Sequence, residues 1–502
     1  MSNSALNKTR LVTRLASPGN ILNYGQLGRR NFLERLGGGF GGIALSHLLA
    51  QDGVLATSKT LQNRLELNGG LHHPAKAKRI IQLFMNGGAS QVDTFDYKPS
   101  LKKLSGEKFD PGSDLKLESV TDSPGFIVMK SPFDFKQYGQ SGRWVSEIFP
   151  NVATIVDDLA FLMAMTSRTN VHGLGVYEQN TGFPMPGFPS MGAWVSYGLG
   201  TSNKNLPSFV VIPDARGLPY NGQKSFSSGF LPTAHQGTLI KPSSPTPIND
   251  IFPPKSAEFV TKTSDREGLE LLNKLNQRHL HENQGNSSLE ARIISYELAA
   301  RMQLSAPPLL DLSSESEATR KLYGIGQKET EDFGRSCLQA RRLVEAGVRF
   351  VQIWSGTNGA EENWDNHANI KSQLGSIAKR TDRPIAGLFK DLKKRGLLQD
   401  TLVIWTTEFG RMPFGQNNSG RDHNGGTFVT WLGGAGIKSG QTYGESDPWG
   451  WRAASNPTSV HDLHATILHL LGINHKRLTY LHNGIYRRLT DVHGHVIKEI
   501  LT

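Results

Sequence analysis

The sequence predicts an α/β fold with a mostly parallel central sheet and helices on both of its faces. Short runs that are apolar at every position alternate with longer segments of helical spacing, which is typical of strands buried in a parallel sheet. Polar clusters directly follow several of these runs, where ligand sites gather beyond the carboxyl ends of parallel strands. The chain has 502 residues, enough for one large domain or two lobes.

Each element is assigned from its apolar spacing and from the Gly and Pro residues that bound it. The first strand stops at a Gly-Gly turn, and the third stops at Pro213. In chain order, the sequence predicts strands at 80–85, up to Thr166 and in "LPSFVVIPD", helical regions at 264–305 and 315–347, a strand in "GVRFVQIWSG", a helix at about 370–395, strands in "TLVIWTTEF" and "TFVTWLGGAG", and a helix in "SVHDLHATILHLLGI".

The domain organisation follows from two segments that break this alternation. Residues 217–260 are rich in Gly, Ser and Pro without periodicity, which predicts a loop-rich surface insertion. Residues 1–56 have the composition of a leader, so residues 57–502 are expected to form one large domain. No later segment reaches the roughly 20 apolar residues of a membrane span. We therefore expect no stable membrane span after processing.

The leader places Arg29 and Arg30 before a mildly apolar, glycine-rich run. This pattern is typical of a twin-arginine export signal, with cleavage expected near Ala56. The alternative is an ordinary Arg-rich helix, which the run "LGGGFGG" disfavours because glycine weakens helices. The leader predicts export by the twin-arginine machinery to the periplasm or the cell surface.

Charge and cysteine content exclude several classes of function. The formal net charge is +11, but no block of consecutive Lys or Arg with interleaved aromatic residues is present, so we expect no nucleic-acid partner. Cys337 is the single cysteine, which excludes an intrachain disulfide and a Cys-rich zinc site. It lies in a helical pattern that predicts a small buried side chain.

Carboxylates and imidazoles gather after the predicted strands and indicate a metal site. "WDNH" and "GRDHN" each bring an Asp and a His together, although an Asp and a His in a loop often only hydrogen-bond to each other. Several such clusters at strand ends favour divalent cations, with two ions expected, either Zn or Mn, Ca or Mg. The candidate ligands are Asp93, Asp96, Asp365, His367, Glu408, Asp422 and His423.

Two arginines between the last predicted strands are candidates for substrate binding. Arg411 and Arg421 could hold a phosphate or sulfate group through paired hydrogen bonds. The alternative is structural ion pairing with Glu408 or Asp422.

A set of longer motifs resembles a known family. The motifs are "IIQLFMNGGASQVDTFDYKP", "ARRLVEAGVRFVQI", "WDNH", "TTEFGRMP", "GRDHNGGTFVTWLGGAGIKSG", "SDPWGW", "HDLHATILHLLGI" and "RLTDVHG". Together they resemble the family of domain of unknown function 1501, over most of residues 78–500. The resemblance implies an alkaline phosphatase and sulfatase-like fold with two metal ions. It implies Asp93 or Asp96 on one ion, Asp365 and His367 on the other, and a ligand role for Glu408 and His423.

The sequence departs from that superfamily at one metal ligand and at the attacking group. Phe409 follows Glu408 where those enzymes have a His, and Cys337 lacks the surrounding sulfatase motif. Phosphatases of the superfamily use a hydroxyl after the second strand. The candidates in that stretch are Thr166, Ser167, Thr169, Asn170 and His172. A water activated by the metals, with His172 as base or ligand, would need none of the hydroxyls.

The sequence therefore supports three hypotheses about function. The first is an exported metal-dependent hydrolase of phosphate or sulfate esters, with an anionic ester substrate for which a polysaccharide is one candidate. The second is a non-catalytic relative that acts as a surface binding or scaffold protein. It is favoured by the missing His after Glu408 and by the lack of one distinct nucleophile at 166–172. The third, a phosphomutase-type transferase, requires a clear seryl acceptor.

Overall fold

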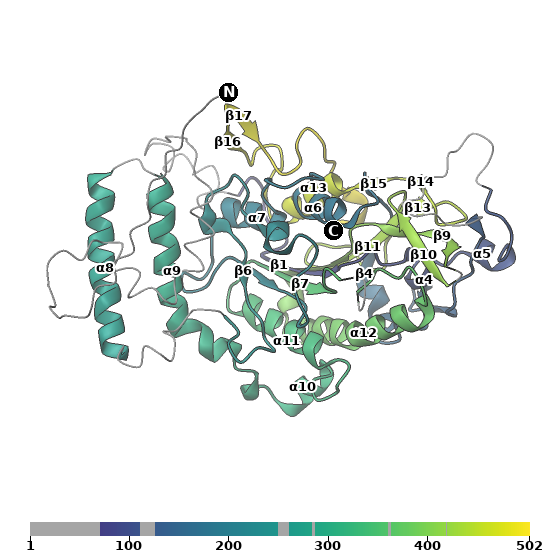
Figure 1. The fold of residues 1–502 in the computed structure, drawn as a ribbon, viewed down its shortest axis with the longest axis horizontal. Coiled ribbons are helices and arrows are strands. Elements are labelled where there is room, and N and C mark those ends of the chain that lie inside the picture. The colour runs from purple at the N-terminus through teal and green to yellow at the C-terminus, as the bar shows by residue number, and fades with distance from the viewer. Residues whose placement is uncertain (1–70, 111–125, 249–260, 284–286, 360–362, 418) are drawn as a thin grey trace, which may run out of the picture.

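A nine-stranded sheet forms the centre of the computed structural model (Figure 1). The structure describes residues 71–110, 126–248, 261–283, 287–359, 363–417 and 419–502. The leader at residues 1–56 lies outside this part of the chain. The strands, in order across the sheet, are β12 (Thr442–Tyr443), β4 (Leu159–Thr166), β11 (Phe428–Gly434), β8 (Thr401–Thr406), β1 (Arg79–Met85), β7 (Phe350–Ser355), β5 (Phe209–Ile212) and β6 (Thr238–Leu239), and β15 (Thr458–Ser459) also pairs with β4.

Helices and short hairpins surround this sheet. The helices are α4 (Gln91–Thr94), α5 (Pro99–Lys103), α6 (His172–Thr181), α7 (Met191–Leu199), α8 (Lys262–Glu282), α9 (Ser287–Leu310), α10 (Glu317–Leu322), α11 (Glu331–Glu345), α12 (Ile370–Lys394) and α13 (Val460–Leu470). The hairpins are β2 (Phe135–Tyr138) with β3 (Arg143–Ser146), β9 (Gly410–Gln416) with β10 (Gly420–Asn424), β13 (Glu445–Ser446) with β14 (Ala453–Ser455), and β16 (Tyr480–His482) with β17 (Ile485–Arg487).

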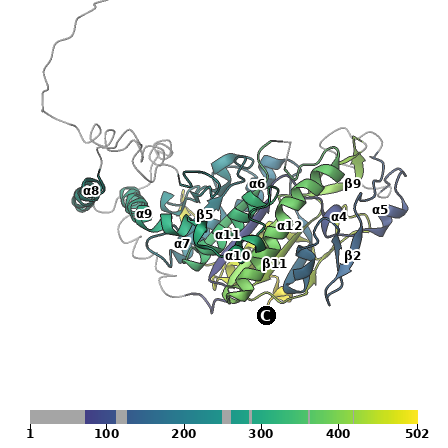
Figure 2. The ribbon, with the colours of Figure 1, turned by 90° about the horizontal axis from the view of Figure 1, so that it is seen from below.

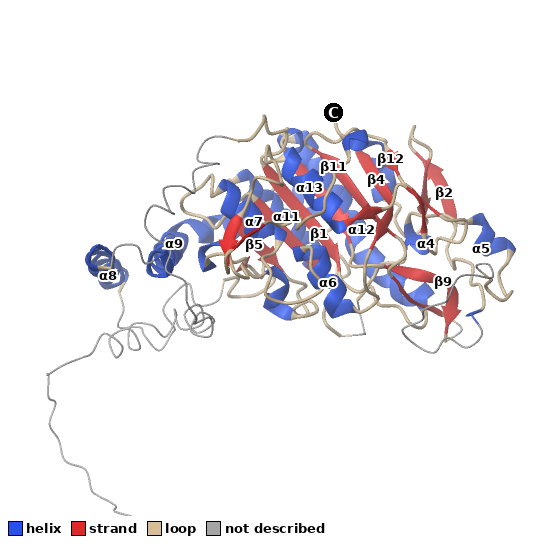
Figure 3. Cartoon of the chain, turned by 90° about the horizontal axis from the view of Figure 1, so that it is seen from above, coloured by secondary structure: helices blue, strands red, loops and turns tan. Residues whose placement is uncertain are grey.

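Each face of the sheet has its own hydrophobic core. In β1, Ile81 and Leu83 belong to the core that α11 and α12 complete, whereas Ile80 and Phe84 belong to the core of α6, α7 and α13. Figure 2 shows α11 and α12 over one face, and Figure 3 shows α6 and α13 over the other. Burial of each such side chain contributes about 1.5–3 kcal/mol. The predicted α/β fold with a mostly parallel sheet and helices on both faces is therefore confirmed.

Strand β11 runs against the direction of its neighbours. It pairs antiparallel with both β4 and β8, whereas β1 pairs parallel with β7 and β8. An antiparallel strand begins at the edge where a parallel strand ends, so the connection from β8 to β11 stays at one edge of the sheet. That connection contains the hairpin β9–β10, where the sequence indicated polar residues between two buried strands.

Part of the glycine-rich segment after β5 packs into the fold. Phe226 and Leu231 are buried in the same core as α7, and β6 extends the sheet by pairing with β5. Isolated apolar side chains without periodicity thus still fill a core, and the loop-rich insertion at 217–260 stays a prediction. Residues 249–260 of the predicted insertion lie outside the described part.

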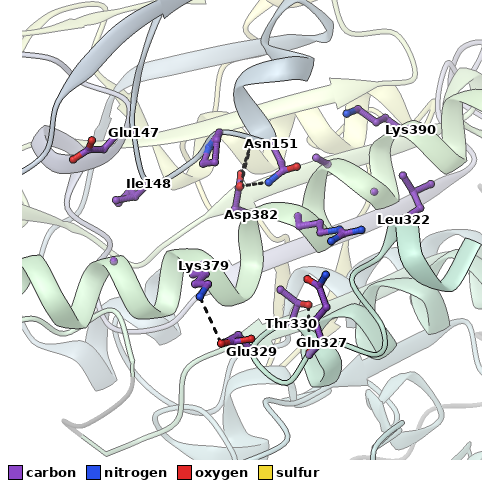
Figure 4. Close-up of a pocket in the computed structure, with 15 residues that line it drawn as sticks. Glu147, Ile148, Asn151, Leu322, Gln327, Glu329, Thr330, Lys379, Asp382 and Lys390 are labelled. Carbon is purple, nitrogen blue, oxygen red and sulfur yellow. Dashed lines mark hydrogen bonds and ion pairs between the residues drawn. The ribbon is translucent and has the colours of Figure 1, made fainter. Parts of the chain in front are cut away.

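Helix α12 is tied to the segment before β4 through a buried carboxylate. Asp382 accepts a hydrogen bond from the backbone nitrogen of Asn151 (Figure 4) and another, of 2.8 Å, from the backbone nitrogen of Val152. These nitrogens begin the 3₁₀ helix Val152–Asp158, whose first turn has no internal acceptor for them. The pocket of about 590 Å³ beside Asp382 therefore surrounds a structural contact.

Helix α13 begins with a capping box between Ser459 and Asp462 and buries His464 completely. The His464 Nε2 lies 3.1 Å from the carbonyl oxygen of Gln179. Burial lowers the pKa of His464 to about 3, so its ring is neutral in the folded protein at neutral pH.

This burial predicts a loss of stability in mild acid. Because the folded-state pKa lies below the ordinary value, the contribution is complete above pH 6.5 and is lost as the pH falls toward 3. Between about pH 7.5 and pH 5, this group alone costs about 2 kcal/mol. We expect a smaller fall in melting temperature over that range for His464→Gln than for the wild type. Exposed His281 is the control, and a fall in His464→Gln equal to that in His281→Gln would contradict the assignment.

Cys337 is fully buried in α11, and burial raises its pKa well above the ordinary value. A thiol in that state is protonated and shielded from reagents. We expect no reaction with a thiol-specific reagent in the folded protein and one equivalent after denaturation. Rapid labelling of the native chain would show that α11 opens readily.

None of the described helices is both long and apolar enough to cross a membrane.

Candidate metal centre

Four side chains meet at the edge where several parallel strands end. His172 is the first residue of α6, which follows β4, and Asp365 and His367 lie between β7 and α12. His423 lies in β10 of the hairpin that follows β8. Because β4, β7 and β8 run in the same direction, their carboxyl ends share this edge. We call His172, Asp365, His367 and His423 the His–Asp cluster.

One carboxylate oxygen is at the centre of the His–Asp cluster. Asp365 Oδ1 lies 2.8 Å from His367 Nε2, 3.1 Å from His423 Nε2 and 3.2 Å from His172 Nε2. The four ligand atoms all lie within 4.8 Å of one another. A metal ion could be held by a group of at least three His, Cys, Asp or Glu side chains. Among the described residues, the His–Asp cluster is the one group of this kind.

The other nitrogen of each imidazole faces an oxygen acceptor. The Nδ1 atoms lie 2.7 Å from Glu408 Oε1 for His172, 2.5 Å from Gln416 Oε1 for His367, and 2.7 Å from the Asn170 carbonyl oxygen for His423. A carbonyl oxygen only accepts, so His423 Nδ1 carries the proton. A neutral imidazole protonated at Nδ1 has its lone pair on Nε2, the atom that a metal binds.

The environment of His172 Nε2 indicates whether the cluster fits a cation. This atom is buried and has no hydrogen-bond partner, because its approach to Asp365 lacks hydrogen-bond geometry. A buried nitrogen without a partner costs about 1–3 kcal/mol. A cation among the three Nε2 atoms and Asp365 would satisfy it. The donor set of three imidazoles and one carboxylate suits zinc or a similar borderline cation.

Arg411 fixes the central carboxylate. Its guanidinium lies 2.5 Å from Asp365 Oδ1 and also donates to the carbonyl oxygens of Gly87, Gly88 and Arg421. Burial would raise the pKa of Asp365, but Arg411 and the three imidazoles hold it well below its usual range. Burial and Arg411 also lower the pKa of His423 to about 4. These charges keep Asp365 ionised and His423 neutral, the states in which both bind a metal.

A match to a family model decides the family of this protein. The model described as "Protein of unknown function (DUF1501)" matches residues 77–501. The chain belongs to the DUF1501 family. No curated protein matches.

Solved structures similar to this DUF1501 chain share few of its residues. The protein Ps i-CgsB is 12% identical, with a TM-score of 0.34, over 79% of this chain and 72% of its own. The lipoteichoic acid synthase LtaP from Listeria monocytogenes is 9% identical, with a TM-score of 0.32, over 82% and 78%. The alkaline phosphatase from the Antarctic bacterium TAB5 is 13% identical, with a TM-score of 0.29, over 72% and 92%. Similarity at this level transfers no residue role to the DUF1501 chain.

Glu408 is not one of the four cluster residues, but it contacts His172 Nδ1. Its Oε1 also accepts a hydrogen bond from the Gly87 backbone nitrogen at 2.8 Å, and its Oε2 accepts one from the Thr407 hydroxyl at 3.1 Å. The carboxylate therefore orients His172. Phe409, the next residue, packs with its ring centroid 4.8 Å from the ring centroids of His172 and His423.

Asp93 and Arg421 form a buried ion pair with each other. Arg421 Nε lies 2.6 Å from Asp93 Oδ2, and both side chains are fully buried. Arg421 also donates to the carbonyl oxygens of Met129 and Met412. The guanidinium of Arg421 thus neutralises Asp93 in the place of a metal ion. Of the two candidate arginines, Arg421 pairs with Asp93 and Arg411 pairs with Asp365. The sequence had indicated Glu408 or Asp422 as the alternative partners.

Asp96 and Asp422 also lie outside the His–Asp cluster. Asp96 forms an ion pair of 3.1 Å with Lys98 and accepts a hydrogen bond from Ser446. Asp422 accepts a hydrogen bond from the backbone nitrogen of His423 at 2.8 Å. The described residues therefore gather one set of ligands, and the number of ions stays a prediction.

The candidate hydroxyls after β4 are engaged in structural hydrogen bonds. Ser167 donates to Glu178, and Thr169 accepts from the backbone nitrogen of Val171 just before α6. Thr166 lies 3.4 Å from the carbonyl oxygen of Thr458. The carbonyl oxygen of Asn170 orients His423, and its side-chain oxygen accepts a hydrogen bond from the Gly425 backbone nitrogen. His172 is the residue of this stretch that enters the cluster.

Two residues at the centre carry no signal in the sequence. Tyr220, from the segment predicted as a surface loop, stacks its ring parallel to His172 at 4.5 Å and 5°. Its hydroxyl lies 3.3 Å from Asn363 Nδ2, and burial raises its pKa, so it stays protonated. Gln416 orients His367 only because the hairpin β9–β10 folds back. Both contacts arise from tertiary structure, which residue spacing does not reveal.

Proposed function

We propose that this protein is a metal-dependent hydrolase that holds one divalent cation in the His–Asp cluster. The observation that carries the proposal is the convergence of three Nε2 atoms on Asp365 while each Nδ1 faces an oxygen acceptor. Such outer acceptors fix the orientation and protonation state of metal-binding imidazoles. Three imidazolium ions beside Arg411 would instead crowd four positive charges around two carboxylates.

The residues of the His–Asp cluster and Arg411 have distinct roles in this proposal. His172, His367, His423 and Asp365 hold the cation, and Arg411 keeps Asp365 in place. When bound, the cation supplies Lewis acidity toward an ester oxygen and lowers the pKa of a water. The attacking group is water, because the candidate hydroxyls are engaged elsewhere. His367 is 27% exposed and Asp365 only 7%, so substrate enters from the side of His367.

The proposed substrates are anionic esters of phosphate or sulfate. The support is chemical: a buried cationic centre favours an anion in its open position. A second candidate, a metal-binding protein without catalysis, is favoured by one observation. Within the described residues from Thr166 to Thr169, each side-chain hydroxyl is already hydrogen-bonded within the chain.

We also propose export through the twin-arginine pathway, with the mature protein in the periplasm or at the cell surface. The support is the Arg29–Arg30 pair before a glycine-rich apolar run. Export of a reporter fused to residues 1–56, lost on replacing both arginines with lysine, is the expected result. A reporter retained in the cytoplasm with the native leader would refute the proposal.

The first test of function is elemental analysis of the full chain, purified without chelator. About one ion per chain is expected, and its removal by a chelator should lower the melting temperature because the ion binds the folded state. The metal-loaded and metal-depleted proteins are then compared on a panel of phosphate and sulfate esters. Metal-dependent turnover supports the hydrolase, bound metal without turnover supports the second candidate, and a folded protein that binds no ion refutes both.

A further inference from the structure

A pocket of about 540 Å³ is lined by Lys102, Lys130 and Lys371, among other residues. Lys102 lies in α5, Lys130 precedes β2, and Lys371 lies in the first turn of α12. All three are exposed, and no carboxylate among the described residues neutralises any of them. The dipole of a helix also disfavours a cation in its first turn. Three separate segments thus place uncompensated positive charge around one pocket.

The same pocket has an aromatic wall. The half-buried ring of Tyr97 packs 5.1 Å from Phe135 and 4.5 Å from Trp144, and Phe133 lies buried beside them. Tyrosine presents a flat apolar face with a polar end. That face suits the C–H face of a sugar ring, which is apolar while its edges carry hydroxyls.

Two carboxylates complete the lining without contacting the free lysines. Asp134 and Glu147 lie together, since the backbone nitrogen of Asp134 is 3.3 Å from Glu147 Oε1. Neither forms an ion pair with Lys102, Lys130 or Lys371. A ligand that carries anionic groups and hydroxyl groups on one ring would satisfy both sets.

Two lysines of the pocket lie on segments that also carry residues of the His–Asp cluster or of its supporting contacts. Lys371 follows His367, the most exposed cluster residue, by four positions. Lys130 follows Met129, whose carbonyl oxygen accepts a hydrogen bond of 3.0 Å from Arg421. Arg421 lies two residues before His423 in β10. The two sites are thus built on shared segments.

We propose that this pocket binds a sulfated or phosphorylated sugar residue of the substrate, so that the substrate is an anionic saccharide. The lysines bind the anionic group as compact charges, Tyr97 carries the ring, and Asp134 and Glu147 accept hydroxyls. This inference rests on the proposed function for the position of the cleaved ester. Binding in the pocket itself requires no metal.

The experiment is calorimetric titration of the full chain at about 0.15 M salt. The probes are a heparin-derived tetrasaccharide, the same tetrasaccharide after desulfation, and glucose 6-phosphate. The test variant combines Lys102→Gln, Lys130→Gln and Lys371→Gln. The matched control combines Lys328→Gln, Lys438→Gln and Lys476→Gln, which remove the same charge from exposed lysines elsewhere.

The test variant should bind the sulfated tetrasaccharide or the sugar phosphate about tenfold more weakly or worse, while the control stays within about twofold of the wild type. Whichever anionic probe binds identifies the group, and the desulfated probe should bind poorly. Equal losses in both variants, equal binding of the desulfated probe, or no binding would overturn the inference. Saccharide binding should persist in His423→Ala. The experiment therefore distinguishes an error in the proposed saccharide site from an error in the proposed metal centre.

Discussion

Replacing His423 with alanine is expected to lower the affinity for the cation more than about 100-fold and to abolish any metal-dependent hydrolysis. The substitution removes one of three converging Nε2 atoms and leaves a cavity beside Asp365. Loss of an outer acceptor alone typically costs 10- to 100-fold in metal affinity, and loss of a ligand costs more. Elemental analysis after dialysis against a weak chelator measures the effect.

Two further variants separate ligand loss from general damage. Glu408→Gln keeps a hydrogen-bond acceptor for His172 but removes its charge, so an intermediate loss of about 10- to 100-fold is expected. His495→Ala removes an imidazole that is 94% exposed and should leave metal content unchanged. Full metal content in His423→Ala would show that the ion binds elsewhere.

Replacing Arg421 with methionine is expected to destabilise the protein by about 3–5 kcal/mol, because it leaves the Asp93 carboxylate buried and unpaired. The two side chains are fully buried, with their closest atoms 2.6 Å apart. Thermal and urea unfolding measure the loss.

The double variant Asp93→Leu with Arg421→Met should recover part of that stability, because it also removes the buried charge. The matched control is Arg278→Met, which breaks an exposed pair with Glu282 on α8 and should cost less than about 0.5 kcal/mol. A loss in Arg421→Met no larger than in Arg278→Met would show that water reaches Asp93.

The sheet could be predicted because its strands are apolar at every position. The strand predicted at 80–85 corresponds to β1, and the helix predicted at about 370–395 corresponds to α12. The direction of β11 could not be read from "TFVTWLGGAG", since buried parallel and antiparallel strands have the same composition. The burial of Phe226 could not be predicted, because the few apolar residues around it lack a period.

The candidate centre was predictable in part, because several of its residues directly follow predicted strands. Asp365, His367 and His423 could be proposed from their places after strands, and the structure brings them together with His172. Asp93 has an equally suggestive place, yet its partner Arg421 is 328 residues away. Whether a carboxylate meets an arginine or a cation depends on tertiary contacts that local spacing does not encode.

The reversed direction of β11 has an evolutionary consequence. Because β8 and β11 are paired, both ends of the segment between them are fixed side by side at the cluster edge. The cost of closing a loop grows only slowly with its length, so this segment can gain or lose residues while the strand pairing stays the same. New substrate contacts can therefore be selected there without redesigning the core.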